Sequence, residues 1–227
     1  MLSVIILALF SCNGNTENVE KNSSTNNTKQ EQIVQVQESF DFEYLTDSTL
    51  NQIIVSRSKW FESWKWNEKT LKIDDFKIDW EKDTDIKWIE YNPQDAYVKQ
   101  YDSLLIQSEG KLALDLYSYN TLIEHEGASV LVEFDVDFKP YIVDKTNGLR
   151  AEITTGGSYE IIEDGLWLDD KRIVLLGYLH ENENTPFLWL IDIDAKKQVA
   201  YNYLNSFVEA RNNYFFTKYP STKLRTE

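Results

Sequence analysis

The sequence predicts a mainly β domain, built as an antiparallel meander with one amphipathic helix near its N-terminus. From Thr70 onward, apolar and polar residues alternate with a period of two, which is typical of half-buried strands. Turn residues such as Glu109-Gly110, Gly156-Gly157 and Asn182 to Pro186 separate the apolar runs. Because the turns are short, each strand is expected to pair with its neighbour in the chain. Propeller-like hairpins and an open sheet or sandwich both fit this pattern.

The first element is the helix, which the spacing of apolar residues predicts over residues 47–65. The residues at helical spacing are Leu50, Ile53, Ile54, Arg57, Phe61 and Trp64. Asp47 or Ser48 is expected to cap the helix by accepting a hydrogen bond from a free N–H of the first turn. The apolar face should pack on the sheet, and a second helix is possible at 204–215.

The strands follow in order. The segments expected to be strands are 71–80, 86–91, 96–101, 103–108, 111–119, 129–138, 139–144, 150–155, 159–162, 166–168, 172–179, 187–192 and 198–203. The pair 172–179 and 187–192 is apolar on both faces and should therefore lie in the interior of the sheet. Trp189 should be buried there, whereas His180, at the start of a polar connection, should be exposed.

A faint repeat links 103–117 with 171–193. Each segment is an apolar strand, a turn and a second strand that ends in Asp, a pattern typical of β-propeller blades. The strand region is long enough for only about three blades, fewer than the four to eight of a closed propeller. An open sheet or a sandwich of such hairpins is therefore the favoured arrangement.

Net charge excludes one class of partner. The chain has 38 acidic and 23 basic residues and a formal net charge of −15. The phosphates of nucleic acid would be repelled by such a chain, so we expect nucleic acid not to be a partner. The same charge argues against peripheral docking on anionic lipid through basic residues.

The N-terminus indicates where the protein resides. The run from Leu2 to Phe10 is almost wholly apolar but far shorter than the roughly 20 residues that span a membrane as a helix. Leu9-Phe10-Ser11-Cys12 resembles the lipobox of bacterial lipoproteins, although Phe10 is bulkier than usual and no Lys or Arg precedes the run. By this resemblance, residues 1–11 are a signal peptide and Cys12 is the lipidated residue. An ordinary leader peptide and a mis-assigned start are the alternatives.

Two further segments follow Cys12. Residues 12–38 are rich in Asn, Thr, Ser, Gln, Glu and Lys, and such a composition cannot bury enough apolar surface to fold. We therefore expect a disordered tether there, and a single mainly β domain over 39–227.

Residues 60–203 resemble uncharacterised lipoproteins of Bacteroidota. The stretches that carry the resemblance are Trp64-Lys65-Trp66, Ile86 to Pro93, Leu114 to Asn120 and the strand pair 172–192. It implies a β fold and a place in the cell envelope, held to the outer membrane by lipid, with the membrane face left open. It implies no activity.

Several groups of residues could carry chemistry. Asp79 to Glu90 has acids at the spacing of a calcium loop, but Thr84 stands where that loop needs Gly, so a charged hairpin tip is favoured. Glu133, Asp135 and Asp137 alternate with apolar residues, which is typical of the solvent face of a strand. Three carboxylates in a row could also hold a cation or act as an acid–base pair.

The remaining candidates are weaker. His125 and His180 lack the partners of a zinc site or a serine triad. Gly156-Gly157-Ser158 could cradle a phosphate, but a hairpin turn is favoured. Trp60, Trp64 and Trp66 could stack on sugars or belong to the core.

No residue is therefore assigned a catalytic or metal-binding role, and no cofactor is expected. Two functions remain open: a non-enzymatic envelope lipoprotein that binds a protein or glycan, and a carboxylate-dependent hydrolase acting on carbohydrate. An acid pair at the bottom of a cleft would favour the hydrolase.

Overall fold

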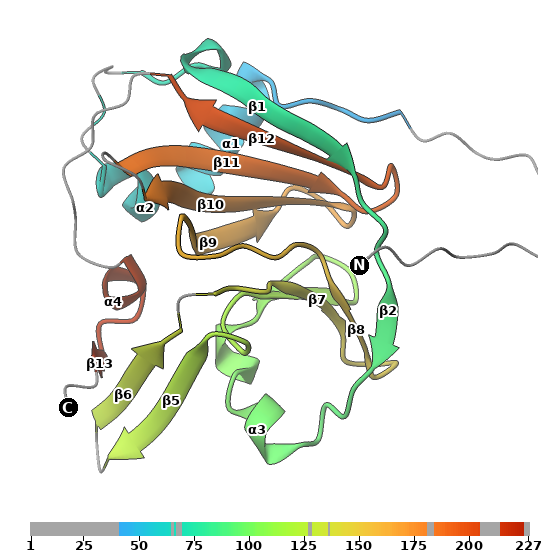
Figure 1. Ribbon diagram of the computed structural model, residues 1–227, viewed down its shortest axis with the longest axis vertical. Coiled ribbons are helices and arrows are strands. Elements are labelled where there is room, and N and C mark those ends of the chain that lie inside the picture. Colours follow the sequence, from blue (N-terminus) through green and yellow to red (C-terminus); the bar gives the residue numbers. More distant parts are fainter. Residues whose placement is uncertain are drawn as a thin grey trace, which may run out of the picture. The chain divides into compact units, whose positions relative to one another are not determined.

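The computed structural model describes residues 41–64, 66, 70–126, 129–135, 137–180, 184–204 and 214–224. Within them it has thirteen strands in three open sheets and a few short helices, which confirms the mainly β prediction (Figure 1). The expected signal peptide, Cys12 and the tether lie outside the described residues.

The largest sheet has five antiparallel strands in the order β1-β12-β11-β10-β9. Its strands are β1 (Phe76–Asp83), β9 (Glu160–Trp167), β10 (Arg172–His180), β11 (Asn184–Asp192) and β12 (Lys197–Tyr203). The hairpin of β10 and β11 lies inside the sheet, as predicted, with Leu175 opposite Trp189. The expected strands 159–162 and 166–168 form the single strand β9.

The other two sheets are built mostly from the middle of the chain. The second has the order β2-β8-β7-β4-β3, with β2 (Trp88–Glu90), β3 (Ile106–Gln107), β4 (Leu112–Asp115), β7 (Tyr141–Asp144) and β8 (Leu149–Glu152). The third has the order β13-β6-β5, with β5 (Thr121–Glu126), β6 (Ser129–Phe134) and β13 (Thr222–Leu224). β13 pairs with β6 in parallel, so the expectation of a wholly antiparallel fold is wrong at this pair.

The expected N-terminal helix is present but interrupted. It consists of α1 (Asp47–Ser56) and α2 (Ser58–Glu62), separated by Arg57, whose backbone leaves the helical region at φ −128° and ψ 37°. Thr46, not Asp47 or Ser48, caps α1 by accepting a hydrogen bond of 3.2 Å from the N–H of Thr49. Asp47 instead accepts the N–H of Ile73 at 2.8 Å and ties the helix to a distant segment.

The expected strand at 96–101 is wrong. Residues Ala96–Lys99 form the short helix α3, because Asn92 accepts the N–H of Gln94 and turns the chain just before it. The remaining helical elements are η1 (Ile73–Asp75), η2 (Asp102–Leu104) and α4 (Tyr214–Lys218). α4 lies at the end of the segment where a second helix was expected, while 205–213 lie outside the described residues.

Two hydrophobic cores cover the two faces of the largest sheet. On one face, Leu176 and Leu190 pack in the same core as Ile53 and Trp60 of α1 and α2, the helices drawn behind the sheet in Figure 1. On the other face, residues of β10 and β11 such as Leu175 share a core with the second sheet. Successive residues of a strand point to opposite faces, so β10 and β11 supply both cores.

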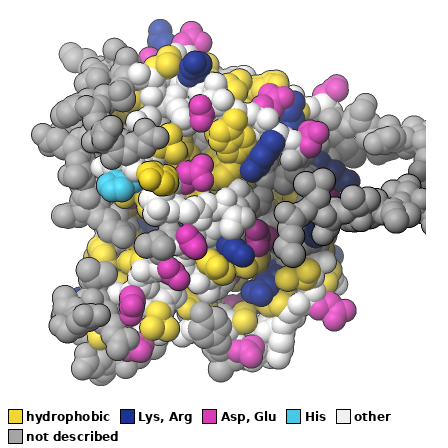
Figure 2. All heavy atoms as spheres, in the orientation of Figure 1, with side chains coloured by type: hydrophobic (Ala, Val, Ile, Leu, Met, Phe, Trp, Pro, Cys, Tyr) yellow, Lys and Arg dark blue, Asp and Glu magenta, His cyan; other side chains and the backbone are white. Residues whose placement is uncertain are grey.

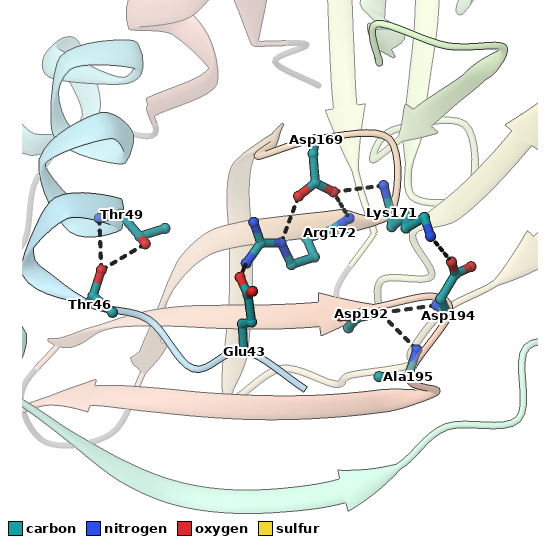
Figure 3. Close-up of polar contacts among 9 residues, drawn as sticks. All are labelled: Glu43, Thr46, Thr49, Asp169, Lys171, Arg172, Asp192, Asp194 and Ala195. Atoms are coloured by element: carbon teal, nitrogen blue, oxygen red, sulfur yellow. Dashed lines mark hydrogen bonds and ion pairs between the residues drawn. The ribbon is translucent and has the colours of Figure 1, made fainter. Parts of the chain in front are cut away.

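The segment before α1 is fixed to three strands. The carboxylate of Glu43 lies 2.6 Å from the guanidinium of Arg172 on β10 (Figure 3). The hydroxyl of Tyr44 donates to Glu81 on β1 at 2.7 Å, and the N–H of Leu45 donates to the hydroxyl of Tyr201 on β12 at 3.1 Å. Residues 43–45 are therefore attached to the largest sheet through two side chains and one backbone N–H.

Aspartates at the end of a strand, or two residues after it in the case of Asp169, hold the turns that follow. Asp192 accepts the N–H groups two and three residues ahead at 3.0 and 2.8 Å, and Asp169 does the same at 2.9 and 2.8 Å (Figure 3). Asp115 repeats this pattern at 3.1 and 3.0 Å. Asp115 and Asp192, the aspartates that the two segments of the faint repeat share, therefore each form an Asx turn. The sheets themselves are open and do not form a propeller.

Candidate functional site

A cavity of about 170 Å³ at the start of β9 combines aromatic rings with carboxylates. The aromatic side chains that line it are Tyr117, Phe134, Phe138, Tyr178 and Phe215. The acidic ones are Asp135, Glu160 and Glu163, and no lysine or arginine is among its described lining residues. An apolar wall with a few polar groups is the usual make-up of a ligand site.

Glu163 owes its position to a β-bulge. In the pairing of β9 with β10, Asp164 lies opposite Leu176 and Ile162 lies opposite Gly177, which leaves Glu163 as the extra residue. A bulge redirects the side chain that it carries. Glu163 is only 7% exposed, and its Oε2 accepts a hydrogen bond of 2.8 Å from the indole N–H of Trp60.

Gly177 makes this bulge possible. A Cβ at Gly177 would lie 2.2 Å from the carbonyl oxygen of Ile161 and 2.7 Å from the ring of Phe187. No side chain fits in that space, so β9 can come this close to β10 only opposite glycine. The buried position of the Glu163 carboxylate therefore depends on a residue of the neighbouring strand.

Glu160 is the second acid of the cavity and is half-buried. Burial raises the pKa of its carboxyl, and the charge of Asp79 adds to the rise while Lys82 opposes it. A carboxyl that holds its proton to higher pH can donate a hydrogen bond or act as a general acid nearer neutrality.

Phe138 forms one wall of the cavity through a close contact with Gly156. The two residues exchange backbone hydrogen bonds of 3.1 and 3.2 Å, and a Cβ at Gly156 would lie 2.1 Å from the Phe138 ring. That Cβ would also lie 3.0 Å from the Glu160 carboxylate, so the ring, the glycine and the acid are neighbours.

The same contact decides between the interpretations of Gly156-Gly157-Ser158. Both backbone polar groups of Gly156 are occupied by Phe138, so they are not free to cradle a phosphate. The expected hairpin is also wrong, because this segment connects β8 and β9, which belong to different sheets.

Tyr117 completes the buried side of the site. Its hydroxyl donates a hydrogen bond of 3.0 Å to the backbone carbonyl of Glu163. Burial, followed by the charge of Asp164, raises the pKa of Tyr117 well above its ordinary value. The phenol therefore stays protonated and continues to hold the bulge.

The three alternating acids do not act together. Glu133, Asp135 and Asp137 are all exposed, which confirms their place on a solvent face, and only Asp135 reaches the cavity. Acidic side chains on the face drawn in Figure 2 lie scattered among lysines and arginines.

The calcium-loop alternative also fails. Asp79, Glu81 and Asp83 lie on β1, and Glu81 forms an ion pair with Lys197. The expected hairpin tip is wrong as well, because β1 and β2 pair in different sheets. Among the described residues, no group of three or more acids, histidines or cysteines could hold a metal ion.

The other predicted candidates lie elsewhere. Trp60 is 0% and Trp64 3% exposed, so both belong to the core and cannot stack on a sugar, and Trp66 packs against that core. His180 is exposed as expected, with Nδ1 2.9 Å from Oδ1 of Asn184. The His125 side chain and Cys12 lie outside what the structure describes.

Glu160 and Glu163 are the site residues that sequence reasoning missed. The sequence does carry a signal. Glu163 and Asp164 interrupt an otherwise apolar stretch of β9, whereas a fully buried strand would have no charged residues.

Among the described residues, no helix is long and apolar enough to cross a membrane. Comparisons with protein-family models, curated proteins and solved structures find no match to this chain.

Proposed function

We propose that the protein is a lipid-anchored lipoprotein of the cell envelope whose domain binds one sugar residue of a glycan in the cavity beside β9. The observation that carries the binding proposal is the joint presence of five aromatic rings and three carboxylates in one hollow. The anchoring proposal depends on the lipobox-like sequence that ends at Cys12.

The chemistry of the lining suits a sugar. Of the five rings, those of Phe134 and Tyr178 are only half-buried. Aromatic faces of this kind pack against the C–H groups of a pyranose ring, and carboxylates accept hydrogen bonds from its hydroxyls. The volume of about 170 Å³ is smaller than the roughly 300–1,000 Å³ of most ligand pockets, which suits one ring of a longer chain. Because the lining has acids and no described cation, a neutral or amino sugar fits and a uronic acid does not.

A carboxylate-dependent glycan hydrolase is the second candidate. The raised pKa of Glu160 suits a general acid, and Glu163 and Asp135 supply further carboxylates in the same cavity. The tie between Glu163 and Trp60 favours binding, because that carboxylate already has a hydrogen-bond donor.

Titration calorimetry with defined oligosaccharides tests the binding proposal. The full chain should bind oligomers of glucose or glucosamine through this cavity, whereas any binding of glucuronic acid oligomers should be unaffected by Glu160→Gln. Glu160→Gln should weaken binding about tenfold, as expected for a lost hydrogen bond to a charged group. Glu133→Gln is the matched control, because Glu133 is exposed and does not line the cavity. Equal affinity of both variants and the unaltered chain would reject the cavity as the site.

Chromatography of the oligosaccharides after incubation separates the two candidates. A binding module leaves the oligosaccharides intact, whereas a hydrolase shortens them, and Glu160→Gln should abolish the shortening.

Anchoring is tested by Cys12→Ala, which should leave an unprocessed or soluble protein that no longer fractionates with membranes. A variant that still partitions into detergent like the unaltered chain would refute the lipid anchor.

A further inference from the structure

Asp164, the residue after Glu163 on β9, lines a second and different cavity. This hollow has a volume of about 410 Å³ and lies where the break between α1 and α2 meets η2 and α4. The charged side chains that line it are Arg57, Lys59, Lys218 and Asp164. Three cations thus face one acid, in a chain whose formal net charge is −15.

Two of these cations share the single carboxylate. Asp164 is 1% exposed, with Oδ1 2.6 Å from Nζ of Lys218 and Oδ2 3.4 Å from Nε of Arg57. Burial lowers the pKa of Lys218, and Asp164 opposes that fall. A cluster of two cations and one carboxylate leaves one positive charge uncompensated at the wall of the cavity.

Arg57 also has hydrogen-bond donors to spare. Its Nε and Nη2 donate to the carbonyl of Gly165 at 3.0 and 2.7 Å, and its Nη1 donates to the carbonyl of Ser56 at 2.9 Å. A guanidinium has five N–H groups, so two remain for a ligand. Lys59 is exposed and makes no ion pair within the described part of the chain.

We infer that this cavity, defined by Arg57, Lys59 and Lys218, binds an anionic group carried on a larger molecule: a phosphate, a sulfate or a carboxylate. The hydroxyls of Ser58 and Ser103, which also line it, can donate to the same oxygens. An adjoining hollow of about 280 Å³ shares Ser56, Arg57 and Ile106. Glu109 and Asp169 line it, so it has room for an uncharged or cationic part of the ligand but not for a second anionic group. The site is separate from the acidic cavity and does not depend on the function proposed for it.

Titration calorimetry of the full chain with inorganic phosphate, sulfate and acetate, at low ionic strength, tests the inference. Lys59→Glu should weaken the binding of the preferred anion by about two- to fivefold, the range of an exposed charge pair. Lys77→Glu makes the same change of charge on β1, the opposite edge strand of the sheet from β9, and should leave affinity unchanged. Equal weakening by both variants, or no measurable binding of any anion, would overturn the site.

Arg57→Lys supplies a second test that keeps the charge. Lysine cannot replace the planar guanidinium, which binds two phosphate oxygens at once, so phosphate affinity should fall about tenfold. Thermal melting identifies any loss of folding, and phosphate should raise the melting temperature of the unaltered chain more than that of Arg57→Lys. An Arg57→Lys protein that folds and binds phosphate as well as the unaltered chain contradicts the inference. Glucose 6-phosphate and glucuronic acid, compared at equal concentration, then distinguish a phosphate ligand from a carboxylate ligand.

Discussion

The indole N–H of Trp60 donates a 2.8 Å hydrogen bond to the carboxylate of Glu163, although 103 positions separate the two residues in the chain. Both side chains are buried, at 0% and 7% exposure. The bond joins α2 on one face of the largest sheet to the bulge of β9. It fixes the direction of the Glu163 side chain, which lines the cavity beside β9.

Trp60→Phe should therefore reduce the free energy of unfolding. Phenylalanine keeps most of the buried ring but leaves the Glu163 carboxylate without this donor, which costs about 1.5–3 kcal/mol beyond the lost ring volume. Urea denaturation measures the change. Trp189→Phe is the matched control, because its buried indole N–H has no hydrogen-bond partner among the described residues. Equal losses for the two variants would show that the bond contributes nothing.

Gly156→Ala should destabilise the domain and weaken glycan binding together. Its Cβ would lie 2.1 Å from the Phe138 ring, so the ring must move from the cavity wall, and overpacking of this kind costs about 1–3 kcal/mol. At Gly157 the nearest atom to an added Cβ is 3.7 Å away, in the Asp137 carboxylate. Gly157→Ala should thus change stability by less than about 0.5 kcal/mol. The prediction fails if both variants unfold at the same urea concentration.

Glu160→Gln should stabilise the domain at neutral pH and lose this advantage in acid. Burial raises the pKa of Glu160 in the folded state, so the ionised carboxylate opposes folding above that pKa. As the pH falls through the raised pKa, the carboxyl takes up its proton and the opposition disappears. Urea denaturation of both proteins at a series of pH values, down to the ordinary glutamate value of about 4.3, measures the difference. A difference that does not vary with pH would contradict the assignment.

Trp189→Ala should cost about 3–5 kcal/mol, the range for truncating a large buried side chain. Trp189 is 2% exposed and packs edge-on against Trp80 at a ring separation of 4.8 Å. His180→Ala, on the exposed end of the same hairpin, should cost little and leave glycan binding intact. Melting curves of the two variants provide the comparison. A His180→Ala protein that folds but binds no glycan would show that His180 itself belongs to the functional site, next to Tyr178 of the cavity.

The central hairpin could be predicted because the apolar pattern within each of its strands is enough to indicate burial on both faces. Alternation on β10 and β11 gives apolar side chains on both faces, and only an interior strand buries both. Residues 96–101 are also mostly apolar, yet they form α3 and a turn, since the Asn92 side chain bends the chain first. β5 was missed because its apolar residues are few and flanked by polar ones.

The cavity beside β9 could not be predicted, because its geometry depends on contacts between residues far apart in the sequence. The Glu163 carboxylate is buried only because β9 bulges against Gly177, and its donor comes from α2. Neither relationship leaves a periodic trace in the sequence. The same holds for Arg57, whose place in the apolar spacing of the helix gives no sign that its guanidinium reaches Gly165 on β9.

The attachment of residues 43–45 to the sheet has a mechanical consequence. A pull on the backbone at Asp41 would reach β10 through Glu43 and Arg172, β1 through Tyr44, and β12 through Leu45. The load would thus spread over three strands that are hydrogen-bonded in one sheet, and α1 would be shielded from it. If the protein were held at its N-terminal end and pulled, these contacts would have to break before α1 could unfold.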